Sequence, residues 1–115
     1  MEKKSKQAGK KSKAANLRVT CTNGEIIQNT YAVQTLVEVI KRVGVEKVMR
    51  LKLPNRGLPL ISKELFQDTN KTQYQKCIET GFYLYTKSST NDKFVEIEMI
   101  RRYGEIEWIE IVDFV

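Results

Sequence analysis

The residues of this sequence that could do chemistry are chiefly lysines, tyrosines and carboxylates, and their densest group opens the chain. Residues 1–16 hold six lysines and one glutamate, so this segment accounts for +5 of the chain's net charge of +6. Clustered ammonium groups bind phosphates by releasing counterions from a nucleic acid, without preference for its sequence. We therefore expect an arm that binds DNA or RNA, whose charged residues are Lys3, Lys4, Lys6, Lys10, Lys11 and Lys13.

The same basic segment has other interpretations. Its lysines are interleaved with Ser, Ala, Gly and Gln, a composition that buries too little apolar surface to fold. We expect residues 1–16 to be a disordered tail, followed by a single domain at 17–115 that keeps 14 of the 20 basic and 13 of the 14 acidic residues. A solubilising leader or a linker would have the same composition. Binding to a membrane is not favoured, because no large apolar side chain would anchor the tail.

A second candidate is "GFYLYTK" at 81–87, where aromatic and basic residues follow one another. Alternation places Phe82 and Leu84 toward the core, and Tyr83 and Tyr85 outward, with Lys87 after them. Outward tyrosines stack on bases in some single-strand binders, although tyrosine is also common in ordinary strands. The basic residues of a neighbouring segment, either a modest phosphate patch or a solvated face, are Arg50, Lys52 and Arg56.

Enzymatic chemistry is disfavoured by the residue types that the sequence lacks. With no histidine and two cysteines, it has neither a Cys–His or Ser–His pair for nucleophilic catalysis nor four ligands for a structural zinc ion. The stretch "GKKS" at 9–12 lacks the leading glycine of a phosphate-binding loop. The carboxylates of Glu96, Glu98, Glu107 and Glu110 have no lysine at the spacing of a metal-dependent nuclease. We expect no catalytic residue, no metal and no cofactor.

Turn and capping signals define the first elements of the domain. The stretch "LRVTCTNGEIIQ" at 17–28 alternates apolar and polar residues before an Asn-Gly pair, which predicts a β-hairpin with a type I′ turn. Residues 29–44 predict a helix that Asn29 or Thr30 caps and Gly44 ends. Its apolar stripe, with the spacing of one helix face, consists of Val33, Leu36, Val37, Ile40 and Val43.

The middle of the sequence predicts short strands. Alternation predicts a strand within 45–53 after a short turn, and "PNRG" at 54–57 predicts a β-turn. Residues 58–62 are expected to be extended at a sheet edge, because their proline lacks an amide hydrogen. A further strand is predicted at 81–86, whereas residues 63–80 give no clear pattern beyond a polar loop.

Residues 88–104 are compatible with two elements. A cap at Thr90, a terminator at Gly104 and an i,i+4 pair of Glu98 with Arg102 favour a helix, whereas alternation in the middle of the segment favours a strand. We favour the helix, and we predict a final strand at 105–115.

The predicted order of elements is β–β–α–β–β–β–α–β. The last strand is expected to contain a bulge, because its alternation slips between Trp108 and Ile109. The order defines an α+β fold, with a mixed, mostly antiparallel sheet and two helices on one of its faces.

Several stretches of this sequence resemble a small α+β domain that recurs in uncharacterised bacterial proteins, some of them associated with DNA restriction or processing. These stretches are "LRVT", "NGEIIQ", "AVQTLVEVIKRVGVEKV", "PLISK" and "GFYLYTKSSTNDK", and the resemblance covers most of residues 17–112. The resemblance implies a bacterial origin and a DNA-related context. It implies no activity and no particular binding residues.

Two functions from different classes follow from these observations. The leading expectation is a non-enzymatic, nucleic-acid-associated bacterial protein, whose tail binds phosphates while its domain recognises shape or a partner. The rival is a protein-interaction or assembly module with an incidental tail. We expect a cytoplasmic location, because no apolar run is long enough for a membrane helix and no apolar stretch follows the basic start as in a secretory signal. The oligomeric state stays open.

Deleting residues 1–16 tests the predicted arm. Each neutralised phosphate contributes about 0.7–0.9 to the slope of log affinity against log salt concentration. Six lysines, not all engaged at once, predict a contribution of about 3–5 to that slope. We expect the deletion to flatten the slope and to remove most binding to a generic duplex or single strand at low salt, measured by mobility shift. A full-length protein that binds no nucleic acid at low salt contradicts the prediction.

Overall fold

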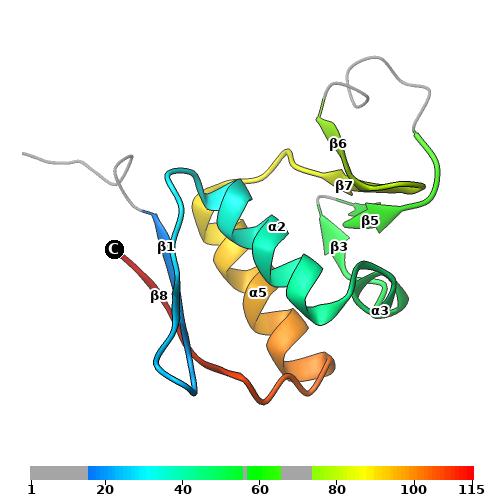
Figure 1. The fold of residues 1–115 in the computed structure, drawn as a ribbon. Coiled ribbons are helices and arrows are strands. Elements are labelled where there is room, and N and C mark those ends of the chain that lie inside the picture. Colours follow the sequence, from blue (N-terminus) through cyan, green and yellow to red (C-terminus); the bar gives the residue numbers. More distant parts are fainter. Residues whose placement is uncertain (1–15, 56, 66–73) are drawn as a thin grey trace, which may run out of the picture.

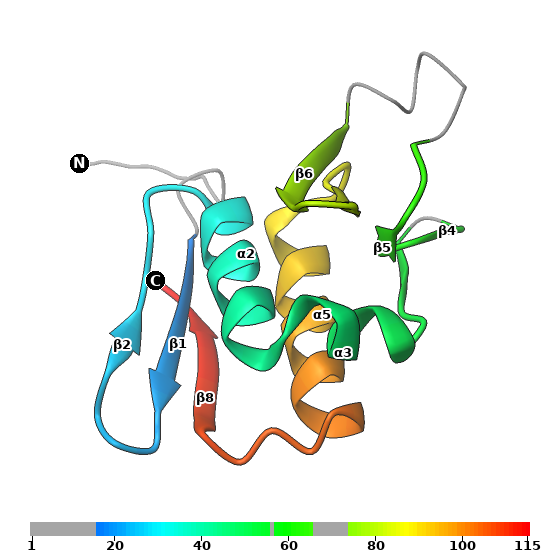
Figure 2. The same cartoon turned by 45° about the vertical axis from the view of Figure 1, so that its right-hand side comes forward.

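The computed structural model describes residues 16–55, 57–65 and 74–115 and has the predicted α+β class (Figures 1 and 2). The six lysines of the tail and Arg56 lie outside the described residues. The elements are, in chain order, β1 (Leu17–Cys21), β2 (Ile26–Ile27), α2 (Ala32–Val43), α3 (Val45–Arg50), β3 (Pro54–Asn55), β4 (Leu58–Pro59), β5 (Ile61–Ser62), β6 (Gln75–Glu79), β7 (Phe82–Tyr85), α5 (Thr90–Tyr103) and β8 (Ile109–Phe114).

The described strands form three small sheets in place of the one sheet that we predicted. Their orders are β2-β1-β8, β3-β4 and β5-β7-β6, and all recorded pairings are antiparallel. Helices α2 and α5 lie side by side against one face of β2-β1-β8, and the other two sheets lie across the helix pair from it (Figures 1 and 2). One apolar core joins these layers, and its fully buried members include Leu17, Val19, Leu36, Ile40, Leu84, Ile97 and Ile100.

The first hairpin forms as predicted, but its turn is of another type. The N–H of Cys21 donates to the carbonyl of Glu25 (2.8 Å), and the N–H of Gly24 donates to the carbonyl of Cys21 (2.9 Å). This is a three-residue loop that ends in Gly24, whose φ is 92°. A type I′ turn needs positive φ at both central residues, and Asn23 does not have it.

Strand β8 closes the domain by pairing with β1. The N–H of Val115 donates to the carbonyl of Asn16 (2.9 Å), and the N–H of Asn16 donates to the carbonyl of Val115 (3.3 Å). Beside them, the Arg18 guanidinium binds the Asp113 carboxylate at 2.7 Å. Asn16 therefore belongs to the folded domain, and a deletion that spares the fold ends at residue 15.

The predicted bulge in this strand is present, one residue further along than expected. Thr20 pairs with Ile111 and Cys21 pairs with Ile109, so that Glu110 is the extra residue. The bulge returns the apolar side chain of Ile109 to the core, where it is buried.

Helix α2 begins later than predicted, because its N-cap is Tyr31. The N–H of Tyr31 donates to the side-chain oxygen of Gln34 (3.0 Å), whereas Asn29 donates its amide hydrogens to other groups. The buried face is also rotated from the predicted stripe. Its buried residues are Thr35, Leu36, Val39 and Ile40, while Val33, Val37 and Val43 are half-buried.

The strand predicted within residues 45–53 is wrong, because this segment contains helix α3. Val45 and Val48 are buried at a spacing of three residues, which is a helical spacing. Gly44, with a φ of 114°, turns the chain between α2 and α3. Arg50 is the last residue of α3, and Lys52 follows it in a turn with a φ of 56°.

The other predicted elements are confirmed in part. Pro54 and Asn55, predicted within a β-turn, form strand β3, which pairs antiparallel with β4, so that Pro59 lies in a two-stranded sheet. Strand β7 forms as predicted, but its neighbour β6 was not foreseen. The ambiguous segment is helix α5, whose N-cap is Ser89 and whose C-cap is Gly104. A side chain at residue 104 would place its Cβ 2.6 Å from the Ile100 carbonyl oxygen.

Leu36→Ala and Ile40→Ala test the core between α2 and the sheet. Both side chains are completely buried, so that each change removes apolar contacts and leaves a cavity. We expect each to lower the free energy of unfolding by about 2–5 kcal/mol, measured by chemical denaturation. The control is Ile26→Ala, whose parent side chain is 54% exposed and should lose less than about 0.5 kcal/mol. Losses as small as the control for both core variants contradict this packing.

Candidate binding groove

A groove of about 410 Å³ runs along the outer side of α2. Val33 and Val37, which the core of the domain leaves half-exposed, supply apolar lining. Lys76 reaches it from β6. Its volume lies within the range of small-ligand pockets. The complete lining is Val33, Gln34, Val37, Glu38, Lys41, Arg42 and Lys76.

A second hollow of about 420 Å³ adjoins this groove and shares Val33 and Lys76 with it. Its other walls come from the start of α2, from the segment between β7 and α5 and from the first turn of α5. They carry hydroxyl groups and one buried ammonium group. The residues that the groove does not already have are Ala32, Thr86, Ser88, Thr90 and Lys93. The binding groove, as we use the term below, comprises both hollows.

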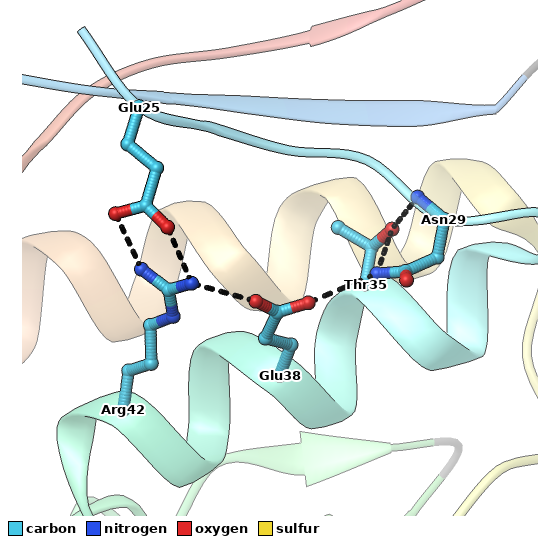
Figure 3. Close-up of polar contacts among 5 residues, drawn as sticks. All are labelled: Glu25, Asn29, Thr35, Glu38 and Arg42. Carbon is cyan, nitrogen blue, oxygen red and sulfur yellow. Dashed lines mark hydrogen bonds and ion pairs between the residues drawn. The ribbon is translucent and has the colours of Figure 1, made fainter.

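One wall of the groove is held by a chain of polar contacts (Figure 3). The Arg42 guanidinium donates to both carboxylate oxygens of Glu25 (2.9 and 2.7 Å) and to Glu38 (2.8 Å). The side-chain amide of Asn29 donates to the other oxygen of Glu38 (3.2 Å). The backbone N–H of Asn29 donates to the hydroxyl of the buried Thr35 (3.2 Å). The chain of contacts fixes the β1–β2 hairpin and the segment after it to α2.

These contacts determine which charges in the groove are neutralised. Hydrogen bonding and attraction from Arg42 lower the pKa of Glu25, and the two carboxylates raise the pKa of Arg42. Arg42 and Glu38 therefore compensate each other within the wall. Lys41 and Lys76 take part in no ion pair among the described residues. The groove consequently has two exposed cationic groups beside apolar side chains, in addition to the buried ammonium group of Lys93.

The buried face of α5 carries two ionisable groups, Lys93 and Glu96, which are 5% and 3% exposed. The Lys93 ammonium donates to the carbonyls of Thr86 (3.2 Å) and Ser88 (2.7 Å) and to the Ser88 hydroxyl (2.8 Å). Burial lowers the pKa of Lys93. Burial raises the pKa of Glu96 to about 7 against the attraction of Lys93, and Oε1 of Glu96 has no hydrogen-bond partner in the described structure.

The basic residues predicted in the middle of the chain lie away from the groove. Arg50 and Lys52 line a separate, mainly apolar hollow beside β4 and β5. The Arg50 guanidinium is paired with Glu46, one helical turn earlier. The lining of this hollow does not include Tyr83, Tyr85 or Lys87.

The two tyrosines of β7 have different environments. Tyr85 is only 5% exposed, so the predicted outward orientation is wrong and no base can stack on its ring. The segment before β5 lies against it, because Asn55 donates to the Tyr85 carbonyl and the Tyr85 N–H donates to the Leu60 carbonyl. Tyr83 is half-buried, and the Lys87 ammonium lies 5.0 Å from the centre of the Tyr74 ring.

Sequence reasoning missed the residues that the groove brings together. Val33 and Val37 were assigned to the core stripe, and only their half-exposure reveals the groove. Lys76 fell in a segment without a predicted element. The lysine of α5 gave one weak signal, since a charged residue at the position of a helix's buried face is unusual.

No group of three or more Cys, Asp or Glu side chains in the described residues is arranged to hold a metal ion. Within the same part of the chain, no helix has the length and apolarity needed to cross a membrane. Comparison with protein-family models, curated proteins and solved structures finds no match. The resemblance to a bacterial domain therefore stays a prediction.

Glu96→Gln tests the cost of burying the charged carboxyl group. Because the pKa of Glu96 is about 7 in the fold and 4.5 in the unfolded chain, the folded protein binds more protons between these values. Stability therefore falls as the pH rises through this range. We expect Glu96→Gln to raise the free energy of unfolding by about 1–3 kcal/mol at pH 8 and by little at pH 4.5, measured by urea denaturation. Glu98→Gln, at a side chain 38% exposed, is the control. An equal response of both variants to pH contradicts the assignment.

Proposed function

We propose that the domain is a protein-interaction module that binds an acidic peptide segment containing apolar side chains. The observation that carries this proposal is the binding groove, where Lys41 and Lys76 flank the apolar side chains of Val33 and Val37. Peptide-binding sites of this kind combine apolar contacts, which supply affinity, with a few charges that select the ligand.

Charge selects among the possible ligands. Arg42 and Glu38 neutralise each other through a hydrogen bond of 2.8 Å, so the exposed unneutralised charge at the groove belongs to Lys41 and Lys76. An acidic segment would neutralise them, whereas a basic segment would leave like charges together. Acidic side chains would therefore raise both the association rate and the selectivity of binding, while apolar side chains would cover the two valines.

Nucleic-acid binding through the tail is the second candidate function. The six lysines within residues 1–16 favour it. Deletion of residues 1–15, which keeps the bonds of Asn16 to Val115, tests it by the mobility shift described above. Within the domain, Tyr85 is buried and cannot stack on a base, and Arg50 is paired with Glu46 at the surface. The two functions are compatible, since the tail and the groove are different parts of the chain.

Charge reversal in the groove tests the proposed function. The probe is a set of synthetic peptides that combine Asp or Glu with Leu, Ile or Phe, together with matched peptides in which Lys replaces the acidic residues. We expect the acidic peptides to bind with a Kd between about 1 μM and 1 mM, measured by fluorescence polarisation. Lys41→Glu with Lys76→Glu should weaken this binding at least about tenfold.

The matched control is Lys47→Glu with Lys63→Glu, which changes two exposed lysines outside the groove by the same charge. All of these variants keep the tail, so that its contribution is constant. If both double variants weaken binding equally, the attraction is general electrostatics and the groove is not the site. Absence of binding to every acidic peptide also contradicts the proposal.

A further inference from the structure

The outer edge of β8 has backbone groups that the domain does not use. In an antiparallel pair, alternate residues direct their N–H and C=O toward the partner strand and the others direct them away. Val115 exchanges two backbone hydrogen bonds with Asn16, which precedes β1. The N–H and C=O groups of Asp113 and Ile111 therefore also point toward β1. Val112 and Phe114 therefore direct their N–H and C=O away from the sheet.

No described element pairs with this edge. Strand β8 is the last strand of the order β2-β1-β8, and helix α5 lies against its inner face, where the rings of Phe94 and Phe114 stack with centres 4.9 Å apart. The Arg101 side chain donates to the carbonyl of Glu110 (2.9 Å), at the bulge. The outward N–H and C=O groups of Val112 and Phe114 have no hydrogen-bond partner in the described chain.

The side chains around this edge are unusually apolar for a free surface. Ile111, Phe114 and Val115 are 47%, 43% and 46% exposed. Natural proteins protect free edges with lysines, prolines or inward charges. Here the one acidic side chain among residues 111–115 is that of Asp113, and Arg18 neutralises it at 2.7 Å.

We propose that β8 pairs with β8 of a second copy of this chain and forms a two-fold symmetric dimer. Val112 of each copy would exchange both backbone hydrogen bonds with Phe114 of the other, which uses all the outward groups of both residues. The three-stranded sheet of each copy would thereby continue into one six-stranded antiparallel sheet.

The side chains favour the same register. With Val112 opposite Phe114, the exposed Ile111 of one copy lies opposite the exposed Val115 of the other, and the symmetry repeats this apolar pair. The two-fold axis passes between the two Asp113 residues, and Arg18 of each copy neutralises the carboxylate there. A second copy is the occupant that we infer, because a strand that pairs with itself supplies the matching edge, the matching apolar pairs and the neutralised charges at once.

Analytical ultracentrifugation of the full chain tests this dimer. We expect the wild-type protein to associate reversibly to a dimer below about 1 mM. Ile111→Lys, which adds a charge opposite Val115, should raise the dimer dissociation constant at least about tenfold. Val112→Pro, which removes an outward N–H that no described group accepts, should do the same. Circular dichroism and thermal unfolding establish that each variant is folded.

The matched control is Ile26→Lys, at an isoleucine that is 54% exposed on the opposite edge strand of the same sheet. Through Thr20, Ile26 lies in the same cross-strand row as Ile111, so a dimer that stacks sheet faces would lose affinity in both variants. Dissociation by Ile111→Lys alone supports edge pairing, even if Val112→Pro does not fold. Equal dissociation by Ile26→Lys, or a wild-type chain that is monomeric at about 1 mM, overturns the proposal.

Discussion

The rest of the structure depends on the pairing of β1 with β8, which joins the beginning and the end of the described chain. The pairing includes the reciprocal backbone bonds of Asn16 with Val115 and the ion pair of Arg18 with Asp113. Bringing such distant residues together costs chain entropy before any contact forms. The burial of apolar side chains from both strands and from α2 and α5 offsets this cost. Because β8 follows α5 directly, closure of the sheet also holds α5 beside α2, and the outer side of α2 is left to form the groove.

In the groove, charged side chains that have an ion-pair partner stabilise the fold, whereas those without one are available to a ligand. Arg42 is the most basic group of the wall, yet its hydrogen bonds to Glu25 and Glu38 make it part of the scaffold. Lys41 is its sequence neighbour and has no such partner in the described structure. A bound acidic group would thus meet Lys41 and Lys76 without breaking an existing contact. For this reason we propose that the two lysines bind the acidic ligand, while Arg42 stabilises the wall of the groove.

Helix α5 buries a carboxyl group, Glu96, whose charged form lowers the stability of the fold. Lys93 satisfies its three protons with two carbonyls and a hydroxyl, and so fastens the segment between β7 and α5 to the helix. Glu96 has no comparable partners for Oε1, and its carboxyl is easier to bury when protonated. A neutral amide would be expected to fit the same space with less strain, so the position is a natural source of added stability near neutral pH.

Local residue chemistry determined the hairpin of 17–27, the helices α2 and α5 and the strand β8, because apolar spacing and glycine positions act within a few residues. It also indicated the bulge near Ile109 and the end of α5 at Gly104. It could not distinguish a strand from helix α3, since Val45 and Val48 show helical spacing only once their burial is known. The same limit applies to Tyr85, Val33 and Lys76. Only the tertiary structure decided that Tyr85 is covered and that Val33 and Lys76 line a groove. Burial depends on neighbours that are distant in the chain.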